Sequence, residues 1–585
     1  MKELKSIHKF FFKYKWKLLV GIIITIIARI FSLFLPPYIN KSITAVENYL
    51  KTPGAGISAV KEELILYIFI IIGTTLLSAF FTFLMRQTII NVSRYVEYDL
   101  KNEIFKQYER LSLGFFKKNR TGDLMNRISE DVTQVRNYAG PAIMYSIQTI
   151  TLFICVIPIM IYKAPTMAMY TLIPLPFLSV LIYKISKVIH ERSTAVQAYL
   201  SDLSAFSQES FSGISVIKAY GIEPETNATL ANLANEGKDK SMNLAKVNAW
   251  FMPLMILMIG LSTTLAIYVG GMQYINGKIH SIGIIAEFIM YVNFLTWPVA
   301  IVGWVTSIVQ RAEASQKRIN EFMSLTPEIQ NETEENSLIN GKITFNNVSL
   351  TYDDTNITTL NNVSFTLQKG ETLALIGKTG SGKSTILDLI GRLYDVTGGE
   401  ILIDNTPIRQ INLYDLRNSI GAVPQDAFLF SDSIKNNIRF GKADATDEEI
   451  IEATKKAAVH ENILGFTKQY DTVLGERGIT LSGGQKQRVS IARAMIKDPK
   501  IYLFDDSLSA VDTETEEQIL NNLRKISNEK TTIIVSHRIS SVKNADKIIV
   551  LEDGKITQQG THNQLISQEG YYKELYLNQL SEKEN

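Results

Sequence analysis

The chain has 585 residues, a formal net charge of +2 and 46% hydrophobic residues. This length exceeds what one hydrophobic core organises, so at least two domains are expected. The single cysteine, Cys155, excludes internal disulfides and thiolate metal clusters, and the six histidines show no metal-ligand spacing, so no structural zinc is expected.

Long apolar stretches dominate the first 320 or so residues. A membrane-spanning helix needs about 20 mostly apolar residues. Stretches that reach or approach this length are residues 18–39, 64–86, 138–162, 164–185, 249–275 and 282–309. So many apolar runs of this length are not typical of the buried helices of a soluble protein. The sequence therefore predicts an all-α membrane domain over residues 1–322, built from six long transmembrane helices.

The distribution of lysine and arginine predicts the orientation of these spans, because cytoplasmic loops carry an excess of both. Six lysines precede the first span, and the loops 86–137 and 184–248 are rich in Lys and Arg, whereas the loops 40–63 and 276–281 are poorer. The N-terminus and the long loops are therefore expected in the cytoplasm, and the chain in a cell membrane of the bacterial cytoplasmic type.

The two long cytoplasmic loops are too long for simple connections. We expect them to extend the spans as helical hairpins, with tips near residues 116–122 and 213–221. After the last span, residues 323–340 are expected to form a linker. Residues 341–585 have scattered charge and predict a soluble α/β domain on the cytoplasmic side.

A glycine-rich loop in this second domain predicts a nucleotide site. Residues 371–376 have strand character and residues 386–393 a helical pattern, and the loop between them matches G-x-x-x-x-G-K-[ST]. Backbone N–H groups of such a loop surround phosphate oxygens, and the helix N-terminus adds positive charge. Lys383 is expected to reach the β and γ phosphates of ATP, and Ser384 to ligate Mg²⁺. The loop consists of Gly377, Lys378, Thr379, Gly380, Ser381, Gly382, Lys383, Ser384 and Thr385.

An apolar run over residues 501–504 leads into Asp505. The pattern predicts a buried strand with an acid at its carboxyl end, where parallel sheets bind their ligands. Asp505 is therefore expected to hold Mg²⁺ through water. Taken alone, such a run is more often only the end of a strand, and its significance here comes from Lys383.

Between these elements lies Leu481-Ser482-Gly483-Gly484-Gln485, and with it the chain resembles the ATP-binding cassette (ABC) family. Other motifs of the family follow in order: an aromatic that stacks on adenine, a glutamine that reaches Mg²⁺, an aspartate at the dimer contact and a switch histidine. In this sequence they are Tyr352, Gln425, Asp512 and His537. The segment Glu476-Arg477-Gly478 resembles an exporter-type loop that touches the membrane domain.

The resemblance covers nearly the whole chain and implies an exporter half, with six spans fused to one P-loop cassette. It implies a dimer in which Ser482, Gly483, Gly484 and Gln485 contact ATP bound to the facing cassette. A Ser-Gly-Gly turn at a helix start is itself an anion-binding nest, which agrees with that role. For three of these residues a purely structural role remains open: Tyr352 as an ordinary strand aromatic, Gln425 as a surface turn residue and His537 as a capping residue after the strand 532–535.

One position departs from the family pattern. Cassettes that hydrolyse ATP well place Glu directly after the Mg-binding aspartate, and here that position is Asp506. Asp is one methylene shorter, and a misplacement of about 1 Å can lower a rate roughly 100-fold. Three hypotheses follow: a heterodimer in which this chain carries the weak site, a homodimer with two slow sites, and a nucleotide-gated membrane protein that does not pump.

The resemblance implies transport by alternating access, with a second half-transporter and the lipid bilayer as partners and no nucleic acid. Polar groups inside the spans are candidates for function, because their burial in lipid is costly. Arg29 and Glu287 could bind substrate, pair with each other or snorkel to the membrane surface. The substrate is expected to be hydrophobic or amphipathic, of the drug or lipid class, with short peptides also open. The other candidates are Gln148 and Asn293, and the aromatics Tyr291, Trp297 and Trp304, which could stack on amphipathic or cationic cargo.

Overall fold

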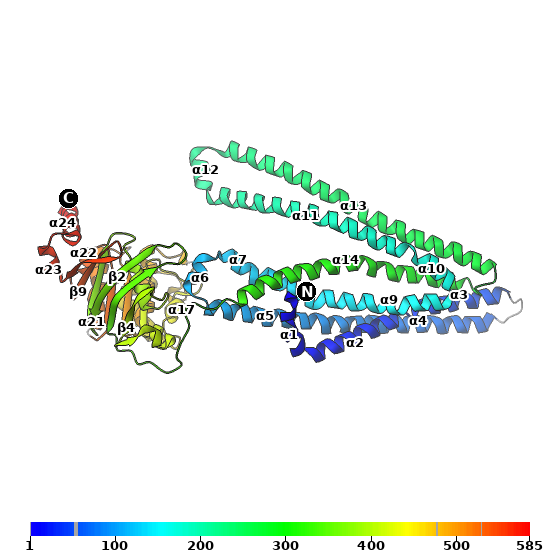
Figure 1. Ribbon diagram of the computed structural model, residues 1–585, viewed down its shortest axis with the longest axis horizontal. Helices are drawn as coiled ribbons and strands as arrows, with labels where there is room; N and C mark the ends of the chain where they lie inside the picture. The colour runs from blue at the N-terminus through cyan, green and yellow to red at the C-terminus, as the bar shows by residue number, and fades with distance from the viewer. Residues whose placement is uncertain (1, 52–56, 476–477, 510, 528, 585) are drawn as a thin grey trace. The chain divides into compact units, whose positions relative to one another are not determined.

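The computed structural model describes residues 2–51, 57–475, 478–509, 511–527 and 529–584, and the chain divides into two compact units (Figure 1). The first unit comprises Met1–Glu109 and Gly122–Leu325, and the second comprises Arg110–Thr121 and Thr326–Asn585. A short piece of the first cytoplasmic loop thus belongs to the second unit. The expected domain limits at residues 322 and 340 stay predictions.

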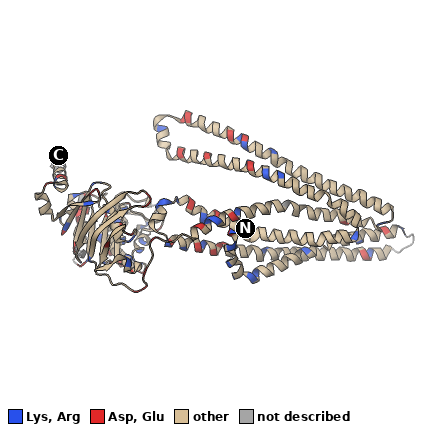
Figure 2. Cartoon of the chain, in the orientation of Figure 1, with Lys and Arg blue, Asp and Glu red and all other residues tan. Residues whose placement is uncertain are grey.

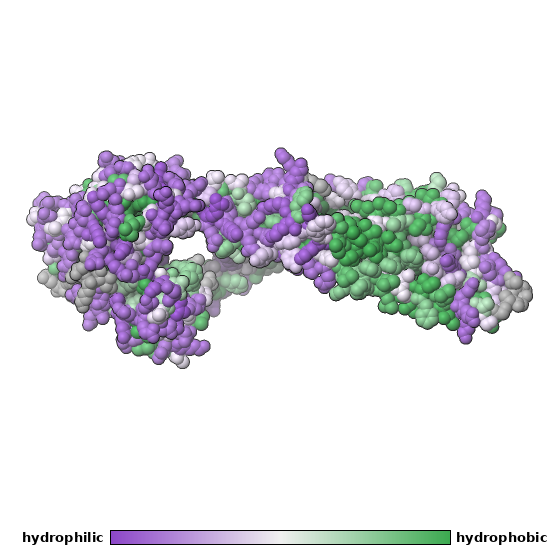
Figure 3. All heavy atoms as spheres, turned by 90° about the horizontal axis from the view of Figure 1, so that it is seen from below, coloured by the Kyte–Doolittle hydropathy of each residue, from purple (hydrophilic) through white to green (hydrophobic). Residues whose placement is uncertain are grey.

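The first unit is helical, and within its described residues six helical stretches are long and apolar enough to cross a membrane. This confirms the predicted number of spans. The stretches are Lys15–Lys51, Ile57–Arg110, Thr121–Lys163, Pro165–Ser212, Glu223–Ile275 and Gly283–Met323. Their charged residues gather toward the helix ends (Figure 2), and hydrophobic side chains cover the surface of their middle part (Figure 3). Large apolar side chains such as Phe69 and Phe80 are exposed on this surface. Their exposure is expected for helices surrounded by lipid, because lipid tails are as apolar as these side chains.

The first apolar stretch consists of two helices. Helix α2 (Lys15–Ser32) ends shortly before Pro36-Pro37, and α3 (Leu35–Lys51) then continues past residue 39. The first part of the segment expected between the spans at 40–63 is therefore helical, as far as Lys51. The two prolines lie in the first turn of α3, where their missing N–H groups would have no helical acceptor.

Both long cytoplasmic loops continue the spans as helices, as predicted. Their tips are the short helices α6 (Leu113–Lys118) and α12 (Ile214–Tyr220), and Gly221 ends the latter with φ 64°. The π-helical turns η2, η3 and η4 interrupt the second and third spans. The remaining elements of this unit are η1 (Glu3–Ile7), α1 (His8–Lys13), α4 (Ile57–Met85), η2 (Arg86–Ile90), α5 (Asn91–Arg110), α7 (Thr121–Asn126), η3 (Arg127–Asp131), α8 (Val132–Asn137), η4 (Tyr138–Ala142), α9 (Ile143–Lys163), α10 (Pro165–Leu172), α11 (Pro174–Ser212), α13 (Glu223–Ile275) and α14 (Gly283–Met323).

The second unit is α/β and contains two sheets. The larger has the strand order β10-β9-β3-β8-β7-β6, parallel except for β10, and the smaller is antiparallel with the order β2-β1-β4-β5. The strands are β1 (Ile343–Thr351), β2 (Thr358–Leu367), β3 (Thr372–Gly377), β4 (Gly398–Ile403), β5 (Thr406–Pro407), β6 (Ile420–Val423), β7 (Ile501–Asp505), β8 (Thr531–Val535), β9 (Lys547–Glu552) and β10 (Lys555–Gly560).

The parallel core positions the site. Strands β3, β7 and β8 are almost continuously apolar and buried, as strands covered on both faces must be. Since β8 pairs with both β3 and β7, their carboxyl ends meet at one edge of the sheet. The helices of this unit are α6, α15 (Lys383–Ile390), η5 (Ile408–Gln410), α16 (Leu413–Asn418), α17 (Ile434–Arg439), α18 (Asp447–Lys456), α19 (His460–Leu464), η6 (Gln469–Asp471), α20 (Gly483–Ile496), α21 (Thr513–Ser527), α22 (Ile539–Val542), α23 (His562–Ser567) and α24 (Tyr571–Glu584).

Candidate nucleotide site

The glycine loop turns from β3 directly into α15. Gly377, Gly380 and Gly382 have φ angles of 154°, 81° and 98°, values that favour glycine over other residues. A Cβ atom at Gly377 would also collide with the carbonyl oxygen of Leu551, and one at Gly382 with that of Thr359. The backbone therefore needs glycine at these positions. Helix α15 begins at Lys383, earlier than the predicted 386, because Gly382 already completes the turn.

Lys383 is folded back over its own loop. Its side chain is 6% exposed, and its Nζ donates to the carbonyl oxygens of Gly377 and Lys378, each at 2.8 Å. Burial lowers the pKa of Lys383, while the negative charges of Asp505 and Asp506 raise it. The hydroxyl of Ser381 is buried in the loop without a hydrogen-bond partner among the described residues. An unsatisfied donor and a buried ammonium beside a helix N-terminus fit the phosphates of a nucleotide.

Ser384 and Asp505 meet at the edge of the sheet. The Ser384 hydroxyl donates to Oδ1 of Asp505 at 3.0 Å. Burial raises the pKa of Asp505, the hydrogen bond from Ser384 lowers it, and the charge of Asp506 raises it again. A hydroxyl and a carboxylate held side by side are oxygen ligands of the kind that Mg²⁺ binds. The pair fits the divalent cation that the sequence predicted here.

Asp506 follows β7 in a left-handed conformation, with φ 41°. Its N–H donates to the carbonyl oxygen of Val535 at 3.0 Å, and the Ser509 hydroxyl donates to its carbonyl oxygen at 2.8 Å. Asp is among the few residue types other than glycine that adopt this conformation readily. The backbone therefore fixes where the Asp506 carboxylate starts, and side-chain length sets how far it reaches.

Helix α20 carries the second glycine motif. The Ser482 hydroxyl accepts from the N–H of Gln485 at 3.4 Å, and the Gln485 side chain accepts from the N–H of Ser482 at 3.0 Å, which is a capping box. Ser482 and Gly483 are exposed, and a Cβ atom at Gly483 would meet nothing within 4 Å. The start of α20 is thus rigid and open to a ligand from outside the chain.

Tyr352 lies beside the glycine loop, and two neighbours that the sequence did not reveal accompany it. Its hydroxyl is 3.3 Å from Oγ1 of Thr385, and its ring meets that of Tyr394 edge-on at 5.1 Å between centroids. The Nζ of Lys117, on α6, lies 5.6 Å from the Tyr352 ring centroid and 5.1 Å from that of Tyr394. Burial raises the pKa of Tyr352. The basic pair Lys117-Lys118 at a loop tip was the only sequence signal for this contact.

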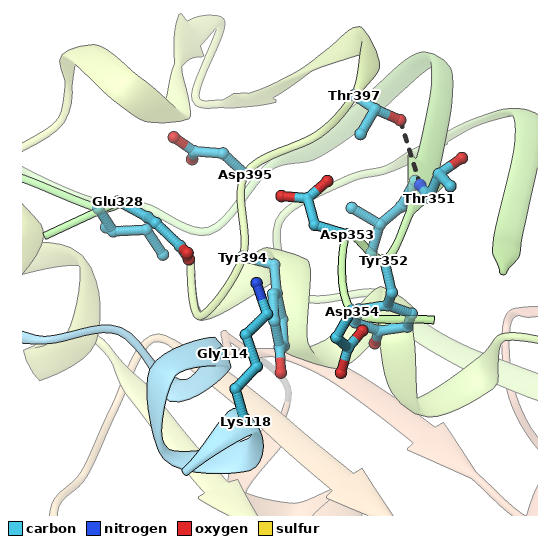
Figure 4. A pocket seen from close by; sticks show the side chains of 12 residues that line it. Gly114, Lys118, Glu328, Thr351, Tyr352, Asp353, Asp354, Tyr394, Asp395 and Thr397 are labelled. Carbon is cyan, nitrogen blue, oxygen red and sulfur yellow. Dashed lines mark hydrogen bonds between the residues drawn. The ribbon is translucent and has the colours of Figure 1, made fainter. Parts of the chain in front are cut away.

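A cavity of about 140 Å³ opens beside Tyr352 (Figure 4). Lys118 reaches into it from α6, and Tyr394 stands between this lysine and Tyr352 (Figure 4). Aspartates contributed by the loop after β1 line the other side: Asp353 and Asp354. The tip of the first cytoplasmic loop is therefore part of the surroundings of the proposed adenine-stacking residue.

The other predicted site residues make no described side-chain contact with Ser384 or Asp505. The Gln425 side chain is exposed, and only its backbone oxygen has a described partner, the amide of Gln487 at 3.1 Å. The structure thus brings together two of the three predicted Mg²⁺ ligands, Ser384 and Asp505.

The predicted dimer-contact residue, Asp512, caps α21 by accepting from the N–H of Thr515 at 3.0 Å. His537 follows β8, and its carbonyl oxygen accepts from the side-chain amide of Gln579 at 2.8 Å. Two residues of the exporter-type loop, 476 and 477, lie outside the described residues.

Fold and site define a class of protein: a six-span membrane domain fused to a P-loop ATPase. Comparison with known proteins agrees. A model of the ABC transporter transmembrane region matches residues 18–299, and an ABC transporter model matches residues 360–509.

Curated relatives align over most of the chain. The multidrug resistance-like ATP-binding protein MdlA of Escherichia coli is 36% identical and covers 86% of each chain. The ATP-dependent lipid A-core flippase of Syntrophus aciditrophicus is 34% identical and covers 83% of this chain and 80% of its own. A bacterial Atm1-family ABC exporter with ATP bound superposes with a TM-score of 0.80 at 26% identity, covering 96% of this chain and 99% of its own.

The chain therefore belongs to the ABC transporter family, with the fold of an exporter half. It is a multi-pass membrane protein with a cytoplasmic ATPase domain that binds ATP and drives export.

Proposed function

We propose that this chain is the weakly hydrolytic half of a heterodimeric exporter for hydrophobic or amphipathic substrates of the drug or lipid class. The glycine loop binds ATP, while the partner chain supplies the glutamate of the efficient site. The observation that carries the proposal is Asp506, whose backbone is fixed after β7 by its hydrogen bonds to Val535 and Ser509. With the backbone fixed, the missing methylene leaves the carboxylate short of an attacking water.

Each part of the site has a proposed role. The glycine loop and Lys383 bind the phosphates, and Tyr352 stacks on the adenine. Ser384 and Asp505 hold Mg²⁺, with Gln425 joining them when its exposed side chain turns inward. A bound Mg²⁺ would neutralise charge on the β and γ phosphates. His537 stabilises the γ-phosphate, and Asp512 contacts the facing cassette.

The exposed start of α20 gives this chain a part in the efficient site. The exposed helix N-terminus at Gly483 would bind the γ-phosphate of ATP held by the partner. The names of the relatives support the substrate class, since they refer to multidrug resistance and to a lipid flippase. The chain would thus contribute to turnover mainly through a site that its partner completes.

Lengthening residue 506 tests the proposal. In the purified chain, where a second copy of the chain supplies the facing α20, Asp506→Glu should raise the ATP turnover about tenfold or more, since about 1 Å of reach corresponds to a factor of up to roughly 100. Asp506→Asn, which keeps the length, should leave turnover at or below the parent rate. All three proteins should bind ATP alike. Brisk turnover by the parent chain, with little gain from Asp506→Glu, would instead favour a homodimer with two working sites.

A further inference from the structure

A guanidinium lies deep inside the first span. Arg29 is 14 residues after Lys15, the first residue of α2, which is about 21 Å along the helix. Its neighbour Gln148 lies 15 residues before Lys163, the last residue of α9, or about 22 Å. Both side chains are therefore within the hydrocarbon region, where a charged group is costly and is retained for a function.

Within the described part of the chain, no acidic side chain forms an ion pair with Arg29. Its guanidinium donates to Oε1 of Gln148, whose amide in turn contacts the sulfur of Met85 at 3.0 Å. The pairing with Glu287 that the sequence left open does not occur. Glu287 is fully buried and is held by Lys163 at 2.6 Å instead. Among the described residues, Arg29 has no ion-pair partner.

Arg29 instead lines a cavity of about 200 Å³ between α2, α9 and α14. The wall is partly aromatic, with Tyr145, Phe294 and Trp297, and partly polar, with Asn293 and Thr149. Trp297 is 67% exposed, so its ring is open to a ligand. Tyr145 also meets Trp304 edge-on at 5.5 Å between centroids, which fixes its position beside the cation. Of the residues that the structure describes, none that lines this cavity is acidic.

We propose that this cavity binds the anionic headgroup of an amphipathic substrate, with Arg29 as its counter-ion. The inference rests on the proposed function and narrows its substrate class from amphipathic to anionic amphipathic. An unneutralised guanidinium with an amide and a hydroxyl beside it complements a phosphate or carboxylate. The open Trp297 and Phe294 rings then contact the apolar part of the molecule. Trp297, one of the aromatics that suggested a cationic cargo in the sequence, thus lines a cavity with a positive charge, which repels a cation.

The test compares two lipids that differ in headgroup charge. The assembled transporter is placed in nanodiscs of zwitterionic lipid, and binding of lysophosphatidic acid and lysophosphatidylcholine with the same brominated acyl chain is measured by quenching of tryptophan fluorescence. We expect the anionic lipid to bind about tenfold more tightly, as for one charge-assisted contact. Arg29→Gln should abolish the preference, Arg29→Lys should retain most of it, and Arg192→Gln, a matched change on α11 away from the cavity, should leave it intact.

Other outcomes overturn the proposal. Equal binding of both lipids to the parent protein would exclude an anion site. Competition by inorganic phosphate at the same concentration would indicate a soluble anion rather than an amphipath. Loss of the assembled dimer in Arg29→Gln, with no preference in the parent, would indicate that the partner neutralises Arg29. Basal ATP turnover in the same samples reports the proposed ATPase function separately, because Arg29 lies outside the nucleotide site.

Discussion

Asp388 lies on α15, about one helical turn after Ser384, and its acidity is changed by its surroundings. Burial raises its pKa to about 6, the charge of Lys117 opposes this, and that of Asp505 adds to it. Because the pKa in the folded state lies above the ordinary value of 3.8, ionisation of Asp388 destabilises the fold. This loss of folding stability is absent below about pH 4, grows between about pH 4 and 6, and is complete above about pH 6.

Asp388→Asn should therefore stabilise the protein at pH 7.5, by up to about 3 kcal/mol for a shift of about two pKa units. At pH 5 the gain should fall to roughly half, since the parent carboxyl is then mostly protonated. Thermal unfolding of the full chain, followed by calorimetry at both pH values, measures the difference. An equal gain in stability at both pH values would contradict a raised pKa of Asp388 caused by burial.

Tyr352 offers a second test at the residue scale. Stacking of a base on an aromatic ring contributes about 1–3 kcal/mol, so Tyr352→Ala should weaken ATP binding about tenfold or more. Tyr352→Phe, which removes only the hydroxyl near Thr385, should bind almost as well as the parent. Equilibrium binding of ATP to the three proteins checks this. Weaker binding in both variants alike would assign the role to the hydroxyl rather than to the ring.

The sequence predicted what depends on local pattern. The glycine loop, the strand ending in Asp505 and the apolar spans are each encoded by neighbouring residues. Contacts between distant segments were not predictable in this way: Lys117 lies over Tyr352 because α6 packs there, and Glu287 binds Lys163 rather than Arg29. The helical continuation after Pro36-Pro37 was missed because proline ends one helix as readily as it begins another.

At the scale of elements, one buried carboxylate ties three helices together. Glu287 on α14 accepts hydrogen bonds from Lys163 on α9 at 2.6 Å, from Asn40 on α3 at 2.7 Å and from Tyr291 at 2.7 Å. Its exposed fraction is 0%. A charge so buried is stable only while every partner is present.

Glu287→Ala should lower the stability of the membrane unit by about 3–5 kcal/mol, because it leaves the Lys163 ammonium without a partner. Glu287→Gln keeps the hydrogen bond from Asn40 and should lower the stability less. The midpoint of thermal unfolding in detergent micelles measures both. Equal midpoints for the parent and Glu287→Ala would show that the network does not hold these helices together.

At the scale of the whole molecule, the chain passes more than once between the membrane unit, Met1–Glu109 and Gly122–Leu325, and the ATPase unit, Arg110–Thr121 and Thr326–Asn585. Helix α6 belongs to the ATPase unit, yet in the sequence it lies between α5 and α7, which belong to the membrane unit. Lys117 therefore connects the surroundings of Tyr352 to two membrane helices through only a few residues. The two units are therefore joined covalently on both sides of α6.

The central claim is that the glycine loop of this chain binds ATP but hydrolyses it slowly because of Asp506. It is tested most directly by measuring bound ATP and the turnover rate in one sample of the purified chain with Mg²⁺. The account predicts close to one ATP bound per chain, lost in Lys383→Ala, with a turnover at least about tenfold below that of Asp506→Glu. Full occupancy together with a parent turnover equal to that of Asp506→Glu would contradict it.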